Sequence, residues 1–263
     1  MDDTRRSFLK FAGISALGLG GVSTLSGLLP SPAGAEQGTS EPHIKQSNKA
    51  LTAGRWGMVV DTRKLTPRLC EKMIAACNKA HNVPDFDNER HIIKWIWTDS
   101  FEHVFPMKDD EYLADRLNGL PILALCNQCN NPPCVQACPT KATFQREDGI
   151  VMMDFHRCIG CRFCMAACPY GSRSFNFRDP RPAIKKENPD FPTRMKGVVE
   201  KCNFCAERLA EGKMPACVEV SEGALTFGDL EDENSEIRQV LRENYAILRK
   251  QSLGTNPSVY YII

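Results

Sequence analysis

The stretch from Cys126 to Pro139 reads CNQCNNPPCVQACP, and the stretch from Cys158 to Pro169 reads CIGCRFCMAACP. In each stretch, three closely spaced cysteines are followed by a fourth that stands directly before proline. This is the pattern in which three thiolates bind one [4Fe-4S] cluster and the fourth cysteine binds the neighbouring cluster. The two stretches therefore predict two clusters that exchange their fourth ligands.

The exchange assigns eight cysteines to two sets of four. We call them site 1, with Cys126, Cys129, Cys134 and Cys168, and site 2, with Cys138, Cys158, Cys161 and Cys164. Zinc is the alternative, but a structural zinc ion closes with four ligands from two cysteine pairs and leaves no role for a cysteine before proline. Between the stretches, residues 149–155 form a short apolar run that predicts a linking strand.

The composition restricts the class of protein. The chain has 263 residues, with 33 Lys+Arg against 32 Asp+Glu, so it shows no basic excess of the kind that predicts a nucleic-acid partner. It also has 13 cysteines, a number that in an exported protein would normally indicate disulfides. Because these cysteines stand in tight ligand spacings, cofactor binding explains them better.

The N-terminus carries an export signal. Arg5 and Arg6 lie in the twin-arginine motif TRRSFLK, which precedes a glycine-rich apolar segment and an Ala-Gly-Ala cleavage site at residues 33–35. We therefore expect residues 1–35 to be a Tat signal peptide, residues 36–54 to be an extended leader, and the mature protein to lie on the periplasmic or extracytoplasmic side. Retention of the segment as a membrane anchor is the alternative. Tat export suits a protein that must receive its clusters in the cytoplasm and cross the membrane folded.

Periodicity and turn residues predict the main elements of the rest of the chain. We expect strands at residues 56–61, 91–97 and 223–228, helices at residues 67–80, 109–117 and 235–250, irregular chain at residues 170–192, and an apolar tail at residues 259–263 docked on the body or on a partner. His81 is expected at the surface or as a helix cap.

Two further groups of cysteines, around Cys77 and around Cys202, complete a known pattern. With them the chain resembles the four-cluster, ferredoxin-like iron-sulfur electron-transfer subunits of molybdoenzymes, hydrogenases and related membrane complexes. In that family the first cysteine group pairs with the fourth, and the second with the third. The resemblance implies an α+β fold of two ferredoxin-like, bis-[4Fe-4S] lobes with a cysteine-free insertion and irregular loops. Its parts are lobe A at residues 55–82 with 198–230, the insertion at 83–121, lobe B at 122–170, and a C-terminal helix and tail at 231–263.

The chain departs from this family pattern at one cluster. Aligned on the turn Asn82-Val83-Pro84, the family pattern places that cluster's ligands at Pro67, Cys70, Met73 and Ser221, so three of its four cysteines are missing. The partner cluster keeps all of its ligands, and we call this set site 3: Cys77, Cys202, Cys205 and Cys217. The resemblance thus implies three [4Fe-4S] clusters, with Cys70 as an orphan thiol. A structural zinc ion at site 3 remains the alternative, because the spacing of its cysteines is less diagnostic.

Within the family the motifs most resemble those of the DsrO-type subunits of the membrane complex associated with dissimilatory sulfite reduction. They include the twin-arginine motif, residues 77–84, the stretch 158–171, residues 201–205 and the terminal Tyr260-Tyr261-Ile262. This resemblance implies a polytopic quinone-interacting membrane subunit, a multihaem cytochrome c and other complex subunits as partners. A subunit of a different molybdoenzyme or hydrogenase complex is the alternative.

The function expected from these residues is electron transfer rather than catalysis. Clusters fully ligated by cysteine leave no open iron for a small-molecule substrate, and the chain has no Ser/His/Asp set, P-loop or Gly-x-Gly-x-x-Gly run. Four basic residues flank the ligands and are candidates for tuning the cluster potentials, although solvated loop positions explain them equally well. They are Lys141, Arg157, Arg162 and Lys201.

Overall fold

The computed structural model of the chain describes residues 48–108, 112, 114–117 and 119–263, which form a mixed α+β fold. The expected signal peptide and most of the expected leader lie outside the described residues. All described residues belong to one unit of the chain, His43–Ile263. Within this part of the chain, no helix combines the length and the apolar character that a membrane span requires.

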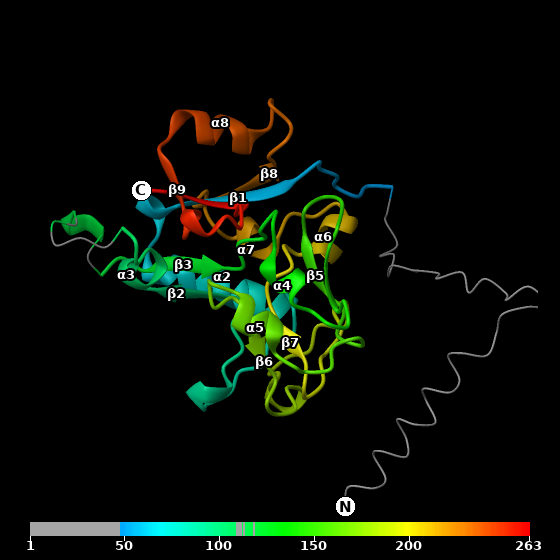
Figure 1. The fold of residues 1–263 in the computed structure, drawn as a ribbon. Coiled ribbons are helices and arrows are strands. Elements are labelled where there is room, and N and C mark those ends of the chain that lie inside the picture. The colour runs from blue at the N-terminus through cyan, green and yellow to red at the C-terminus, as the bar shows by residue number, and fades with distance from the viewer. Residues whose placement is uncertain (1–47, 109–111, 113, 118) are drawn as a thin grey trace, which may run out of the picture. The chain divides into compact units, whose positions relative to one another are not determined.

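A four-stranded sheet in the order β8-β1-β10-β9 forms the frame (Figure 1). Its strands are β1 (Trp56–Asp61), β8 (Leu225–Asp229), β9 (Ala246–Leu248) and β10 (Val259–Ile262). The central strand β1 pairs antiparallel with β8, with Met58 opposite Phe227, and parallel with β10, with Val59 opposite Tyr260. All six residues of β1 are buried, as expected for a strand with neighbours on both edges and cover on both faces. The expected strands at residues 56–61 and 223–228 are confirmed, the second with a small shift.

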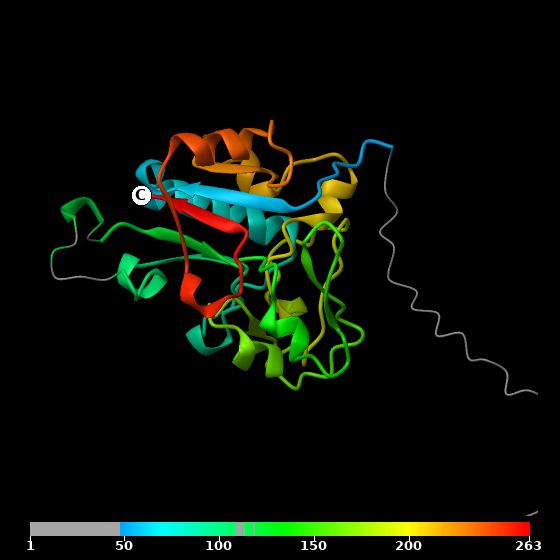
Figure 2. The ribbon, with the colours of Figure 1, turned by 45° about the horizontal axis from the view of Figure 1, so that its top comes forward.

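The two faces of the sheet are covered by different helices. Helix α8 (Glu236–Glu243) covers one face, where Val59 and Ile262 pack against Ile237 (Figure 2). The opposite face, with Met58, Val60 and Tyr261, joins the main core, which also holds helix α2 (Pro67–Ala80). Alternate residues of β1 thus serve two different cores.

Helix α2 has the bounds that the sequence predicts. The side chain of Thr66 accepts a hydrogen bond from the backbone N–H of Leu69, and Pro67 occupies the first turn, where a missing N–H costs nothing. The helix ends at Ala80, and His81 follows as its C-cap. It packs against the short helix α7 (Ala216–Glu219), so that the segments bearing Cys77 and Cys217 of site 3 lie side by side.

The cysteine-free insertion is joined to the body by an antiparallel pair of strands. Strand β2 (Ile96–Asp99) runs antiparallel to β3 (Ile122–Leu125), which leads directly into Cys126. Helix α3 (Phe101–Val104) and two 3-10 turns, Glu89–His91 and Asp115–Leu117, complete the described part of the insertion. The expected strand at 91–97 therefore begins later, at Ile96. Of the expected helix at 109–117, the described residues show only the last 3-10 turn.

Short elements frame sites 1 and 2. Helix α4 (Pro133–Gln136) packs against helix α5 (Phe163–Ala167), and β4 (Thr143–Gln145) pairs with β5 (Val151–Met153), which confirms the strand expected within 149–155. Strand β6 (Ser174–Phe175) pairs with β7 (Val199–Glu200), which precedes Cys202, and helix α6 (Ala206–Ala210) follows Cys205. Most of the chain between β6 and β7 is irregular, as expected.

The C-terminal region differs from the expectation. The predicted helix over 235–250 ends at Glu243, because residues 246–248 form β9 and pair with β10, with Ile247 opposite Tyr261. The tail docks on the body, and it does so as a strand inside the sheet. This long-range pairing overrides the local helical pattern.

Candidate iron-sulfur sites

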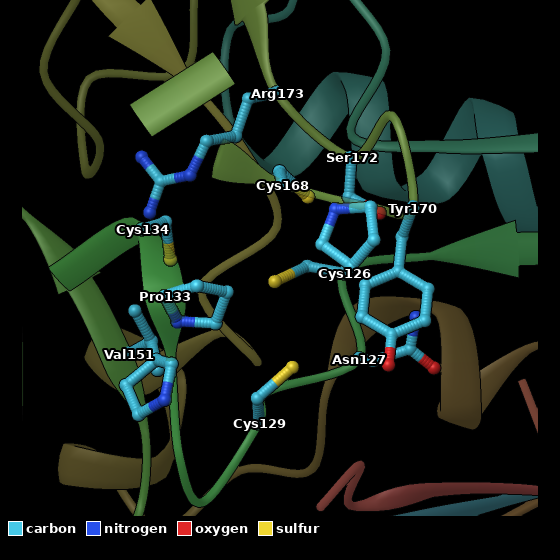
Figure 3. Close-up of a pocket in the computed structure, with 12 residues that line it drawn as sticks. Cys126, Asn127, Cys129, Pro133, Cys134, Val151, Cys168, Tyr170, Ser172 and Arg173 are labelled. Atoms are coloured by element: carbon cyan, nitrogen blue, oxygen red, sulfur yellow. The ribbon is translucent and has the colours of Figure 1, made fainter. Parts of the chain in front are cut away.

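Site 1 forms around one cavity in the described part of the chain. Cys126, Cys129, Cys134 and Cys168 line it together, and Figure 3 shows their sulfur atoms directed into a common space. Cys168 belongs to the second stretch and the other three cysteines to the first, so the structure brings together the four cysteines that the predicted exchange assigns to one cluster. The rest of the lining includes Pro133, Val151 and Tyr170.

The backbone of site 1 is fixed by a buried glutamine. Gln128 adopts a left-handed conformation with φ 43°, and its amide group donates to the carbonyl oxygen of Cys202 at 2.8 Å. Its side-chain oxygen accepts from the backbone N–H of Val151, also at 2.8 Å. This side chain therefore links the Cys126 loop to β5 and to the Cys202 loop.

The same backbone feature recurs in the first Cys-x2-Cys loop of three cysteine groups, those that begin at Cys126, Cys158 and Cys202. The residue before the second cysteine has a positive φ in each: Gln128 at 43°, Gly160 at 70° and Phe204 at 54°. A side chain at such a φ is unfavourable, so three occurrences at equivalent positions indicate one loop geometry used three times. Residues 67–70, which have the same Cys-x2-Cys register in the family pattern, lie in regular helix instead.

Gly160 meets a second constraint besides its φ. A Cβ atom built there would lie 2.5 Å from the carbonyl oxygen of Gly197, which is a backbone atom. The loop between Cys158 and Cys161 thus packs directly on the chain that leads into β7, and only glycine permits this contact.

Site 2 lies next to site 1 and is more exposed. Helix α4, which carries Cys134, packs against helix α5, which carries Cys164, and the Cys164 thiol is within electrostatic range of those of Cys134 and Cys138, so cysteines assigned to the two sites lie close together here. Burial raises the pKa of Cys164. Cys138 and Cys158 are half-buried, and Cys161 is exposed. Two large apolar side chains flank Cys161 in the chain, Ile159 and Phe163, and both are more than half exposed.

Site 3 is buried throughout. Burial raises the pKa of Cys77 well above its usual range, and the neighbouring thiols Cys202, Cys217 and Cys205 raise it further. Burial raises the pKa of Cys217 to about 11. The backbone N–H of Ala216 donates to the Cys205 sulfur at 3.4 Å. The structure therefore brings together the four cysteines assigned to site 3. Cys202 also interacts with Cys126, so site 3 adjoins site 1.

His81 lies beside site 3 and is buried. Of the two positions expected for it, the surface position is therefore wrong. Its Nδ1 lies 2.9 Å from the Cys77 carbonyl oxygen and 3.7 Å from the Cys77 sulfur, and its Nε2 lies 2.8 Å from a Glu207 carboxylate oxygen. The ring stacks on Trp95 with a centroid distance of 4.4 Å. The hydrogen bond from His81 helps to keep the pKa of Glu207 low against the opposing effect of burial.

His81, Cys205 and Glu207 place ligand atoms within 4.8 Å of one another, a geometry that a metal ion accepts. His81 and Glu207 already bond to each other, however, and four thiols stand beside them. A zinc ion held by the four cysteines also fits this geometry, so zinc is still the alternative at site 3.

The four residues at the positions of the missing fourth cluster do not form a ligand set. Cys70 and Met73 are fully buried on α2 within the apolar core, and Pro67 is exposed at the start of the helix. The hydroxyl group of Ser221 donates to the Val218 carbonyl oxygen at 2.8 Å and accepts from the backbone N–H of Leu225. Burial raises the pKa of Cys70 to about 11, so it behaves as a small apolar side chain.

The residues of site 1 suit a [4Fe-4S] cluster. All thirteen cysteines are free thiols. At site 1, burial raises the pKa of Cys129 to about 12, so a thiolate there needs a cationic partner, which a cluster core supplies. The Arg173 Nη2 group and both polar atoms of the Asn127 side chain lack hydrogen-bond partners, and both residues line the cavity. Buried polar groups of this kind are expected to face a group that completes the site.

Comparison with known proteins decides the family. Residues 121–181 match the 4Fe-4S dicluster domain. The chain is 40% identical to the Hdr-like menaquinol oxidoreductase iron-sulfur subunit 1 of Archaeoglobus fulgidus, over 98% of this chain and 97% of that relative. The chain belongs to the family of ferredoxin-like iron-sulfur subunits of oxidoreductase complexes. Like other members of this family, it is a [4Fe-4S] electron-transfer subunit.

Two further family members resemble the chain over most of their length. The menaquinone reductase iron-sulfur cluster-binding subunit of Nitratidesulfovibrio vulgaris is 35% identical over 79% of this chain and 88% of the relative. One tetrathionate reductase subunit, from Salmonella typhimurium, is 30% identical over 100% of this chain and 89% of the relative.

The structure also shows which of the basic residues near the proposed ligands are buried. Lys141, Arg157 and Arg162 are exposed, whereas Lys201 is buried. Arg173, which sequence reasoning missed, is buried as well and lines site 1 (Figure 3). It stands five residues after Cys168, a spacing that carries no ligand signal, so only the folded chain shows its position.

Proposed function

We propose that this chain relays electrons through three [4Fe-4S] clusters arranged in the order site 2, site 1, site 3. The observation that carries the proposal is the order in which the cysteine segments lie: α4, which carries Cys134, packs against α5, which carries Cys164, and Gln128 of the Cys126 loop donates to the Cys202 carbonyl oxygen. Bound clusters supply one-electron transfer, and the protein tunes it through charge, hydrogen bonds and burial. The left-handed loop geometry shared by three Cys-x2-Cys segments, and its absence at residues 67–70, supports three clusters rather than four.

The two ends of this series differ in access to solvent. Site 2 has the exposed Cys161 between the exposed Ile159 and Phe163, whereas all four cysteines of site 3 are buried. We propose that a redox partner exchanges electrons with the chain at site 2. The proposed two lobes fit this arrangement, with sites 1 and 2 in residues 122–170 and site 3 formed by residues 55–82 with 198–230.

The proposed partners are a polytopic quinone-interacting membrane subunit, a multihaem cytochrome c and other subunits of a complex on the extracytoplasmic side. The relatives from Archaeoglobus fulgidus and Nitratidesulfovibrio vulgaris, which are iron-sulfur subunits of a menaquinol oxidoreductase and of a menaquinone reductase, support the quinone partner. The DsrO-like motifs support a link to dissimilatory sulfite reduction, and the twin-arginine motif supports export. A molybdoenzyme-type complex is the second candidate, and the similarity to the tetrathionate reductase subunit favours it.

Purification of the tagged chain from solubilised membranes of its host tests these partners. We expect a complex that contains a quinone-binding membrane subunit and a cytochrome c. Recovery with a molybdenum-containing catalytic subunit and no cytochrome would favour the second candidate. Recovery of the chain without any partner would contradict both.

A further inference from the structure

Four lysine and arginine side chains are buried among the described residues: Arg173, Arg194, Lys201 and Arg249. Arg194 forms an ion pair with the buried Glu200. No carboxylate lies within ion-pair distance of the other three in the described part of the chain. A buried cation without an anionic partner is costly, so the missing negative charge requires an explanation.

Arg249 has a partial partner in an aromatic ring. Its guanidinium lies 5.3 Å from the centroid of Tyr170, and it donates to the carbonyl oxygens of Val104 and Tyr170. The negative face of the ring stabilises the cation there. Among the buried basic residues, this leaves Arg173 and Lys201 without any anionic or aromatic partner in the described chain.

Arg173 lies between site 1 and site 2. Its Nη1 donates to the Thr143 hydroxyl at 3.2 Å, and its Nη2 has no hydrogen-bond partner. Figure 3 shows the guanidinium beside Cys134. Its charge interacts with the thiols of Cys134, Cys164 and Cys126, which belong to both sites.

Lys201 lies between site 1 and site 3. Its Nζ donates to the carbonyl oxygen of Val151, which lines the site 1 cavity, and to that of Cys202, a site 3 cysteine, at 2.7 Å. The thiols of Cys202 and Cys126 interact across the same junction. Each junction in the series of sites therefore contains one buried cation.

We propose that Arg173 and Lys201 are the counter-charges of the two junctions, and that each raises the reduction potential of the two clusters between which it lies. This inference rests on the proposed clusters. A cluster ligated by four thiolates is anionic, and it gains one negative charge on reduction, so a nearby fixed cation stabilises the reduced form. The effect is large only where solvent does not screen the charge, which is the case for these two residues.

The same cations moderate the repulsion between neighbouring sites. Two reduced clusters on either side of a junction repel each other, and a cation between them attracts both added electrons. Arg173 keeps its proton throughout because a guanidinium does not deprotonate in proteins. It contributes charge, not proton transfer.

A purely structural role for Arg173 makes a different prediction. If the guanidinium only holds β4 and β5 together through its hydrogen bonds to Thr143 and Met153, lysine would be as damaging as glutamine, since it lacks the planar fork. If charge is what matters, lysine preserves most of the effect.

Potentiometric titration with dithionite, followed by electron paramagnetic resonance, distinguishes these roles in the full chain loaded with clusters. The variants are Arg173→Gln, Arg173→Lys, Lys201→Gln and the control Arg157→Gln. Arg157 directly precedes the ligand Cys158, but it is exposed and pairs with Asp154 at 3.2 Å. Cys161→Ser and Cys217→Ser assign the signals of sites 2 and 3.

We expect Arg173→Gln to lower the potentials of sites 1 and 2 more than that of site 3, and Lys201→Gln to lower those of sites 1 and 3 more than that of site 2. The reduction potentials of Arg173→Lys should stay nearer to those of the wild type than the potentials of Arg173→Gln do. The potentials of Arg157→Gln should shift little. Shifts in Arg173→Gln no larger than in the control, or equal shifts for glutamine and lysine, would overturn the proposal.

Cluster content is measured for each variant before titration. If Arg173→Gln loses clusters, Lys201→Gln decides the matter by the same comparison at the other junction. A wild-type chain without iron and acid-labile sulfide would refute the proposed function itself, and that result is seen before any potential is measured.

Discussion

Arg194 and Glu200 form an ion pair at 2.7 Å in which neither side chain is exposed to solvent. The Arg194 guanidinium also donates to the Asn82 carbonyl oxygen at 2.9 Å, and Glu200 accepts from the Trp95 indole N–H at 2.9 Å. This pair therefore joins the turn that follows α2 and its Cys77 to β7, which leads to Cys202.

Glu200→Gln leaves Arg194 buried and uncompensated. We expect a loss of about 3 kcal/mol in the free energy of unfolding, because removing one partner of a buried pair strands the other charge. Urea unfolding of the loaded chain, followed by circular dichroism, measures this. The control is Glu211→Gln, which breaks an exposed pair with Lys213 and should cost at most about 0.5 kcal/mol. Equal losses in the two variants would contradict a structural role for the buried pair.

Gly160→Ala introduces a Cβ atom 2.5 Å from the Gly197 carbonyl oxygen, in addition to strain at a φ of 70°. We expect site 2 to lose iron more readily in this variant than in the wild type, measured by the rate of bleaching in a chelator. Gly171→Ala is the matched control, since Gly171 has a φ of 64° and no atom within 4 Å of the new Cβ. It should cost only about 1 kcal/mol from its backbone conformation. If the clusters of Gly171→Ala bleach as fast as those of Gly160→Ala, the contact with Gly197 is not what makes glycine necessary in this loop.

Cys70→Ser and Cys77→Ser separate the orphan thiol from a ligand, although both residues lie on α2 and are buried. Cys70→Ser should leave the iron content and the spectrum nearly unchanged, because Cys70 belongs to no set of four. Cys77→Ser should damage one cluster. If instead Cys70→Ser loses about four irons and Cys77→Ser loses none, the register of the family pattern on this helix is misassigned.

Replacement of Arg5 and Arg6 by lysine tests the proposed export route. The twin arginines are read by a receptor rather than as charge alone, so a folded, cluster-loaded precursor should remain on the cytoplasmic side. Cell fractionation with antibody detection measures this. Normal accumulation of the variant outside the cytoplasmic membrane would refute the Tat assignment.

Local sequence patterns predicted the parts of the fold that local forces determine. The strand at 56–61 and the helix at 67–80 have their expected bounds, because burial pattern and capping by Thr66 act over a few residues. The C-terminal helix was predicted too long, since the pairing of Ile247 with Tyr261 depends on a strand more than ten residues away. The cysteine sets of sites 1 and 2 followed from ligand spacing and that of site 3 from the family resemblance, and the structure brings the four cysteines of site 1 around one cavity.

The charges around the sites could not be predicted in the same way. Of the four basic residues that flank the ligands in sequence, only Lys201 is buried, and Arg173 joins it from a position without any motif. Burial of His81 against Trp95 likewise depends on a contact between α2 and the insertion. These are properties of tertiary packing, which ligand spacing does not encode.

The most direct test of the account is the metal content of the purified full chain, measured as iron, acid-labile sulfide and zinc. We assign twelve of the thirteen cysteines to three sets of four, so we predict about twelve irons and about twelve sulfides per chain, with no zinc. Eight irons with one zinc would contradict the assignment of site 3 to a cluster. About sixteen irons would contradict the loss of the fourth cluster.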